Sequence, residues 1–162
     1  MKKRENGREE DEFFMRRAIA LAKSAAERGN EPFGALLVRG GRIVCERENE
    51  IYTAHDFTRH AEVGLIEKFC AETGIADLGG YTLYSSCEPC CMCCGAMVWA
   101  KLGRLVYGAS DRDLCALLGE EGCDCCGTVF RGMGRGPETL GGVLREESLD
   151  VLRAYFARRT KN

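Results

Sequence analysis

The chain has 162 residues, of which 23 are lysine or arginine and 25 are aspartate or glutamate, so its formal net charge is −2. This length fits one domain with a core that needs no disulfides. A slightly acidic chain has no general attraction to nucleic acid, so a nucleic-acid partner is not expected. No apolar run is long enough to span a bilayer, and the charged start lacks the apolar stretch of a signal peptide. We therefore expect a cytoplasmic protein without membrane contact, in which cysteines are metal ligands or buried thiols.

Periodicity divides the chain into alternating helices and strands. Residues 1–10 are polar and are expected to fray, and residues 11–162 are expected to form a single domain. Helices are predicted at 11–28, 60–72, 88–100, 111–118 and 148–159, and strands at 33–38, 42–49, 81–85 and 105–107. Residues 119–137 are rich in glycine and cysteine and are predicted to be a loop. The order α-β-β-α-β-α-β predicts an α/β fold with helices on both faces of a largely parallel sheet.

Two short segments contain the residues of a catalytic zinc site. They are His60-Ala61-Glu62 and Pro89-Cys90-Cys91-Met92-Cys93, a pairing that is the signature of zinc deaminases. A catalytic zinc takes three nitrogen and sulfur ligands from the protein and keeps one position for water. Cys90 and Cys93 are three residues apart near a helix N-terminus, where the backbone amides favour thiolate. We therefore predict that His60, Cys90 and Cys93 bind one zinc ion per chain.

Glu62 is the predicted proton carrier, because it lies two residues after a metal ligand, too close to bind the same ion easily. Zinc lowers the pKa of its bound water to roughly 7. Water oxygen then replaces an amino group on a ring carbon, while Glu62 passes protons to the ring nitrogen and to the departing ammonia.

A structural zinc site with four ligands is the first alternative, since Cys87, Cys91 and Cys94 flank the ligand pair. Cys91 and Cys94 are rotated by about 100° from Cys90 and Cys93 on a helix, and this rotation disfavours a structural site with four ligands. A zinc-stabilised binding module without activity is a second, non-enzymatic alternative, which the presence of Glu62 disfavours.

A longer series of motif residues runs through residues 31–108. Its members are Pro32-Phe33-Gly34-Ala35, Asn49, His60-Ala61-Glu62-Val63, Tyr84-Ser85-Ser86-Cys87-Glu88-Pro89-Cys90, Met92-Cys93, Gly95-Ala96 and Trp99-Ala100. This series resembles the bacterial guanine deaminase branch of the cytidine-deaminase superfamily. The resemblance implies a three-layer α-β-α fold with a central mixed five-stranded sheet, a homodimer, and deamination of a purine-like or triazine base. The substrate contacts that it implies are the ring against Phe33, a bond to Asn49, and a pocket wall of Ala61, Ser86, Cys87 and Glu88.

The C-terminal third departs from guanine deaminases, in which an aspartate of a Phe-Asp-Asp segment reads the guanine edge and a terminal tyrosine closes the pocket. This chain has neither feature, and Asp111, Asp113 and Asp124 are candidates for the first role by proximity only. Guanine, ammeline-like triazines, other aminopurines, pterins, cytosine and nucleosides therefore stay open as substrates. A C-terminal segment swapped within the dimer is a hypothesis.

The tRNA adenosine deaminases are the main rival, because they share the zinc motif and a similar Gly-Arg-Leu-Val-Tyr-Gly strand. Phosphate contacts for such a substrate are offered by Arg153, Arg158, Arg159 and Lys161. The acidic net charge and the Pro-Phe-Gly-Ala segment disfavour this reading.

Two further features allow more than one interpretation. The segment Cys123-Asp124-Cys125-Cys126 could bind a second metal or sense oxidants, but without a nearby histidine its cysteines are better explained as small buried side chains. His55 is expected at the rim of the pocket rather than among the zinc ligands.

Overall fold

The computed structural model describes residues 2–159, and Lys161, one of the basic residues considered above, lies outside the described residues. Its helices are α1 (Lys2–Glu27), α2 (Ala61–Thr73), α3 (Cys91–Trp99), α4 (Asp111–Leu118), α5 (Cys125–Gly132) and α6 (Arg145–Arg159). Its strands are β1 (Gly34–Arg39), β2 (Arg42–Glu48), β3 (Thr82–Cys87), β4 (Arg104–Ala109) and β5 (Glu138–Leu140). No helix within residues 2–159 is long and apolar enough to cross a membrane.

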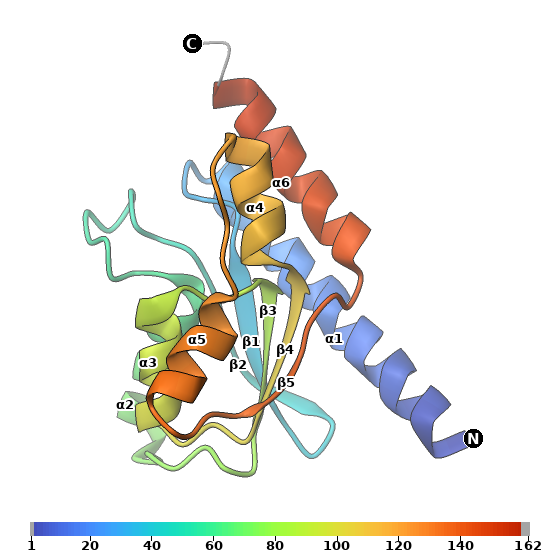
Figure 1. Ribbon diagram of the computed structural model, residues 1–162. Coiled ribbons are helices and arrows are strands. Elements are labelled where there is room, and N and C mark those ends of the chain that lie inside the picture. Colours follow the sequence, from blue (N-terminus) through green and yellow to red (C-terminus); the bar gives the residue numbers. More distant parts are fainter. Residues whose placement is uncertain (1, 160–162) are drawn as a thin grey trace.

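The five strands form one mixed sheet in the order β2-β1-β3-β4-β5. Helices α1 and α6 lie side by side on one face, and α2, α3 and α5 cover the other, so the fold has three layers (Figure 1). This arrangement confirms the predicted α/β fold with a mixed five-stranded sheet. Side chains alternate across the strands as the pleat requires, so that in β3 Leu83 packs toward α2 and α3 while Tyr84 packs toward α1.

The element order alone suggested a largely parallel sheet, and this is wrong for β1. Strand β1 pairs antiparallel with both of its neighbours, whereas β3, β4 and β5 are parallel to one another. The reason is the hairpin that joins β1 to β2. The crossover through α2 makes β3 run parallel to β2, and β3 is therefore antiparallel to β1, which lies between them.

The largest departures from the predicted elements are an earlier start of α1 and two elements that were not predicted. Helix α1 begins at Lys2 instead of residue 11, and the pairs Arg8–Glu12 and Glu12–Arg16, each spaced by four residues, support its exposed first half. Helix α5 lies within the predicted loop 119–137, where glycines and cysteines obscured its periodicity. Strand β5 is three exposed residues long, too short to show an alternating pattern.

Gly34, in the Pro-Phe-Gly-Ala segment, has a structural role. A Cβ atom at this position would lie 2.5 Å from the carbonyl oxygen of Ala18 and 2.5 Å from Cβ of Leu21, both in α1. Only glycine therefore allows the start of β1 to approach α1 this closely. The contact fixes where the chain leaves Phe33 and enters the sheet.

A partly buried ion pair joins α1 to strand β4 of the sheet. Asp11 is 5% exposed, and its two carboxylate oxygens accept bonds of 2.7 and 2.8 Å from Arg104 of β4. The hydroxyl of Tyr84 in β3 donates to the same carboxylate at 2.7 Å. Burial, the largest influence on the pKa of Asp11, raises it, but the bonds and charge of Arg104 with the bond from Tyr84 outweigh burial and lower the pKa overall. The carboxylate therefore stabilises the fold above its unfolded pKa of about 3.9, and this contribution is lost as pH falls through the folded pKa.

Asp11→Asn is expected to lower the free energy of unfolding at pH 7 by about 2 kcal/mol, because Arg104 then loses its charged partner. The loss stays below that of a fully buried pair, since the Arg104 side chain is 28% exposed. Urea unfolding measures it, and the difference from wild type should shrink as pH falls below about 4. The control is Asp150→Asn, whose exposed pair with Arg153 is worth less than about 1 kcal/mol. Equal losses in the two variants would contradict the role given to Asp11.

Candidate active site

The metal-ligand cluster forms where two helices begin. His60 is the N-cap residue of α2 and Cys90 is the N-cap residue of α3, each with extended backbone, so each helix starts one residue after its ligand. Cys93 lies in the first turn of α3 and is buried. The two N-termini point at the same place, so their amide groups and positive dipole ends favour anionic ligands there.

The distances within the cluster fit one zinc ion. His60 Nδ1 lies 3.6 Å from Cys90 Sγ and 3.7 Å from Cys93 Sγ, and the two sulfurs are 3.7 Å apart. A tetrahedral zinc with bonds of about 2.3 Å to sulfur and about 2.05 Å to nitrogen requires edges of about 3.8 Å between sulfurs and about 3.6 Å between sulfur and nitrogen. Among the described residues, these three form the one group of at least three potential ligands that converge in this way. A second metal site at Cys123, Cys125 and Cys126 is therefore not supported.

The thiols of Cys90 and Cys93 differ in the direction of their pKa shifts. Side-chain hydrogen bonds with Cys93 and with His60 lower the pKa of Cys90 to about 4, although burial raises it. The pairing with Cys90 and burial raise the pKa of Cys93, and the bond to Cys90 raises the pKa of His60. The lowered pKa of Cys90 favours its thiolate form, which is the form that binds metal.

Glu62 lies beside this cluster, with 5% of its surface exposed. Its Oε2 is 3.4 Å from Cys93 Sγ, and its Oε1 is 2.8 Å from the hydroxyl oxygen of Ser85 in β3. Burial raises the pKa of Glu62, although bonds from its own backbone amide and from Ser85 oppose the shift. A carboxyl group whose pKa is raised can both accept and return a proton near neutral pH.

A cavity of about 230 Å³ opens onto the cluster. Its lining residues are Glu31, Phe33, His60, Glu62, Glu88, Cys90, Asp111, Leu114, Leu118 and Phe156. A larger groove of about 500 Å³ lies between α1 and α6, but its charged residues have both signs and it contains none of the cluster. The smaller cavity is therefore the one that combines a concave shape with the residues of the metal-ligand cluster.

Two of the six predicted substrate-contacting residues line this cavity, Phe33 and Glu88. Both carboxylate oxygens of Glu88 are bonded to backbone amides, at 2.9 Å to Asp111 and at 3.0 Å to Cys126. Glu88 thus holds the starts of α4 and α5 in place at the cavity wall.

The other four predicted residues, Asn49, Ala61, Ser86 and Cys87, are buried and are not among the lining residues. The Oδ1 atom of Asn49 accepts a bond from the amide of Ile51, while its Nδ2 has no hydrogen-bond partner among the described residues. Ser86 Oγ accepts from the amide of Gly34 at 3.1 Å. His55, expected at the rim, is exposed and is not among the lining residues.

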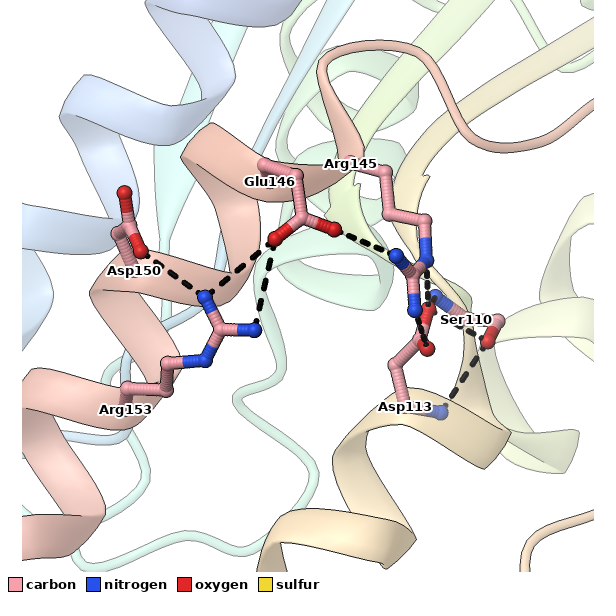
Figure 2. A network of polar contacts seen from close by, with 6 residues as sticks. All are labelled: Ser110, Asp113, Arg145, Glu146, Asp150 and Arg153. Carbon is pink, nitrogen blue, oxygen red and sulfur yellow. Dashed lines mark hydrogen bonds and ion pairs between the residues drawn. The ribbon is translucent and has the colours of Figure 1, made fainter.

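Of the three aspartates considered for substrate recognition, only Asp111 lines the cavity. Asp113 closes a capping box with Ser110 and pairs with Arg145 of α6, which lowers the pKa of Asp113 to about 2 (Figure 2). Asp124 caps α5 through the amide of Gly127.

Sequence reasoning missed the outer wall of the cavity and the partner of Glu62. The outer wall consists of Leu114 and Leu118 of α4 and Phe156 of α6. The spacing of Leu114 and Leu118, four residues apart, signals a shared helix face. The Arg145–Asp113 pair links α6 to α4, and Arg145 also contacts Glu146 (Figure 2). Ser85 belongs to the motif series and Glu31 directly precedes its first member, but no local pattern marked either residue.

Comparisons with known proteins agree with this geometry. Residues 8–109 match the family described as the cytidine and deoxycytidylate deaminase zinc-binding region. Guanine deaminase of Bacillus subtilis is 43% identical over 103 residues, which are 63% of this chain and 66% of that protein. The tRNA-specific adenosine deaminase of the same organism is 36% identical over 152 residues, covering 91% of this chain and 89% of the relative.

A structural comparison places the chain in the same group. A solved structure of guanine deaminase from Nitrosomonas europaea is 25% identical, covers 88% of this chain and 82% of its own, and has a TM-score of 0.76. The family match over residues 8–109 includes strands β1 to β4, helices α2 and α3, and the cluster of His60, Cys90 and Cys93. The chain therefore belongs to the cytidine and deoxycytidylate deaminase family of zinc-binding deaminases.

Proposed function

We propose that this protein is a zinc-dependent hydrolase that replaces the amino group of a small, uncharged, guanine-like base with oxygen and releases ammonia. The lining of the cavity is the observation that carries this substrate class. Besides His60, its ionisable lining residues are Cys90 and the carboxylic acids Glu31, Glu62, Glu88 and Asp111. No lining residue within the described chain is lysine or arginine. Such walls disfavour the phosphate of a nucleotide and favour a neutral ring that carries N–H donors.

His60, Cys90 and Cys93 would hold the zinc ion, and Glu62 would move the protons. Zinc bound there supplies a Lewis acid that lowers the pKa of a bound water to roughly 7. Glu62 accepts a proton at Oε2, the oxygen nearer the cluster. It would then deliver this proton, which comes from the attacking water, to the ring nitrogen beside the amino-bearing carbon. The second proton of that water would be taken up from the new hydroxyl group on the ring carbon and passed to the amine, as the C–N bond breaks and the C=O bond forms.

The apolar wall would orient the ring. Phe33, Leu114, Leu118 and Phe156 all line the cavity and offer flat and branched apolar surfaces. A planar base packed among these residues is held edge-on to Glu62 and is shielded from solvent. Phe33 would lie against the ring, as the sequence series implies.

Deamination of adenosine in tRNA is the second candidate, because a tRNA-specific adenosine deaminase aligns with 91% of this chain. That substrate would need basic residues near the cavity to contact its phosphates, and its affinity would fall steeply with salt.

Ammonia release by the zinc-loaded protein separates these candidates. We expect turnover of guanine, another free aminopurine or ammeline, and none of tRNA at low or high salt. Pterin, cytosine, adenosine and cytidine complete the panel. Turnover of tRNA that is lost between 50 and 200 mM salt, the range in which polynucleotide binding weakens by about 10³-fold or more, would replace the proposed substrate class.

The homodimer and the cytoplasmic location implied earlier stay predictions. Light scattering of the zinc-loaded protein tests the first, and a stable, active monomer would contradict both the dimer and the swapped C-terminal segment.

A further inference from the structure

Ser85 is a polar residue in an apolar part of the core. It lies in β3 opposite Ala35 of β1 and Tyr107 of β4, and it is fully buried. The neighbouring residue on the same face of the strand, Leu83, belongs to the core between the sheet and α2. A hydroxyl group buried in such a place destabilises the fold unless it is hydrogen-bonded. Its partners therefore indicate why a serine is present.

The hydroxyl of Ser85 has two acceptors within reach. They are Oε1 of Glu62 at 2.8 Å and the carbonyl oxygen of Cys87 at 2.7 Å. The other oxygen of the carboxyl group, Oε2, lies 3.4 Å from Cys93 Sγ. The carboxyl group of Glu62 is also bonded by the backbone amide of Glu62 itself, and its described side-chain partners are Ser85 and the metal-ligand candidate Cys93. One oxygen of Glu62 is thus anchored to the sheet, and the other faces the cluster.

We propose that Ser85 is a positioning residue that fixes the Glu62 carboxyl group by its Oε1 atom, so that Oε2 stays directed at the metal cluster and the cavity. The terminal torsion of a glutamate is broad, so an unanchored carboxyl group can rotate in its site. A reacting group that is displaced by a fraction of an ångström loses much of its effect on rate. The inference rests on the proposed role of Glu62, and it adds the residue that keeps Glu62 in place.

Ser85→Ala removes the hydroxyl group and is expected to lower kcat for guanine, or for whichever base the panel identifies, by about 10- to 100-fold, as for other residues that orient a reacting group. KM should change by less than about twofold, because Ser85 does not line the cavity. The matched control is Ser148→Ala, which removes another buried hydroxyl, one on α6 without a hydrogen-bond partner in the described structure. Its kcat should equal that of wild type.

Ser85→Thr and Ser85→Val form an isosteric pair that separates the hydroxyl group from its volume. The threonine variant keeps the donor and should regain most of the lost kcat, whereas the valine variant should not. This comparison also serves if the alanine variant fails to fold. Equal kcat values for the threonine and valine variants, or a wild-type kcat for Ser85→Ala, would overturn the proposal.

Two readouts do not depend on turnover. The visible spectrum of the Co(II)-loaded variants should match that of the wild type, because the ligands are intact, and a changed spectrum would assign Ser85 to the metal site instead. A crystal structure of zinc-loaded Ser85→Ala should show the Glu62 carboxyl group rotated or in two positions. An unmoved carboxyl group would contradict the proposal even if the substrate class proved wrong, whereas failure of wild type to turn over the panel bears only on the proposed function.

Discussion

Glu62→Gln is expected to reduce kcat by about 10³-fold or more while the protein keeps its zinc, since proton transfer by a positioned carboxyl group contributes about 10²- to 10⁴-fold. Glutamine has nearly the same shape, so the cavity and its position beside Ser85 are preserved. It can neither take up a proton from water nor return one to the ring. Burial of Glu62 and the resulting rise in its pKa suit the native carboxyl group to both steps.

Steady-state ammonia release with the preferred base measures this loss, and metal analysis of the same samples measures zinc. The expected outcome is one zinc per chain in wild type and variant, with nearly unchanged KM. Retention of more than about a tenth of wild-type kcat would show that another group carries the protons. Loss of zinc would show instead that Glu62 supports the metal rather than the reaction.

Cys93→Ala is expected to abolish both zinc binding and turnover. Only two of the three ligands would remain. Mutation of residues that merely orient a metal ligand lowers metal affinity by about 10- to 100-fold, so loss of a ligand itself should lower the affinity further. The cluster also joins α2 to α3, so the zinc contributes to stability by binding only the folded chain. The melting temperature of wild type should fall on treatment with a chelator, whereas that of the variant should not respond.

Cys94→Ala is the matched control for this variant. Cys94 is the next residue of α3 and is equally buried, but its sulfur contacts Cys126 and the carbonyl oxygen of Pro89 rather than the cluster. It should lower stability modestly by loss of packing, and it should retain one zinc and most of the wild-type kcat. Loss of zinc in this control would assign the metal to a different set of cysteines.

The metal cluster could be predicted from the sequence because its chemistry is local. The spacing of Cys90 and Cys93 in one helical turn, and of His60 and Glu62 across two residues, already restricts where the ligand atoms can lie. Helical and strand periodicity likewise predicted α2, α4 and β1 to within a few residues. Periodicity could not predict the short strand β5, nor helix α5 within a glycine-rich segment.

The substrate end of the site depends on contacts between residues far apart in the chain. Asp113 is engaged by Arg145, which lies 32 positions away, so its place outside the cavity lining depends on tertiary pairing. Asp124 instead caps its own helix α5 through the amide of Gly127. The bond from Ser85 to Glu62 joins residues 23 positions apart and forms only because β3 packs beneath α2.

The sequence by itself therefore predicted the metal-ligand cluster, the residue proposed as proton carrier and the class of fold, since short spacings and periodicity specify these. Only the tertiary structure decided the walls of the cavity, their negative charge and the anchor of Glu62. These depend on how α4 and α6 close over the ends of the strands, and packing between distant segments leaves no periodic trace in the sequence.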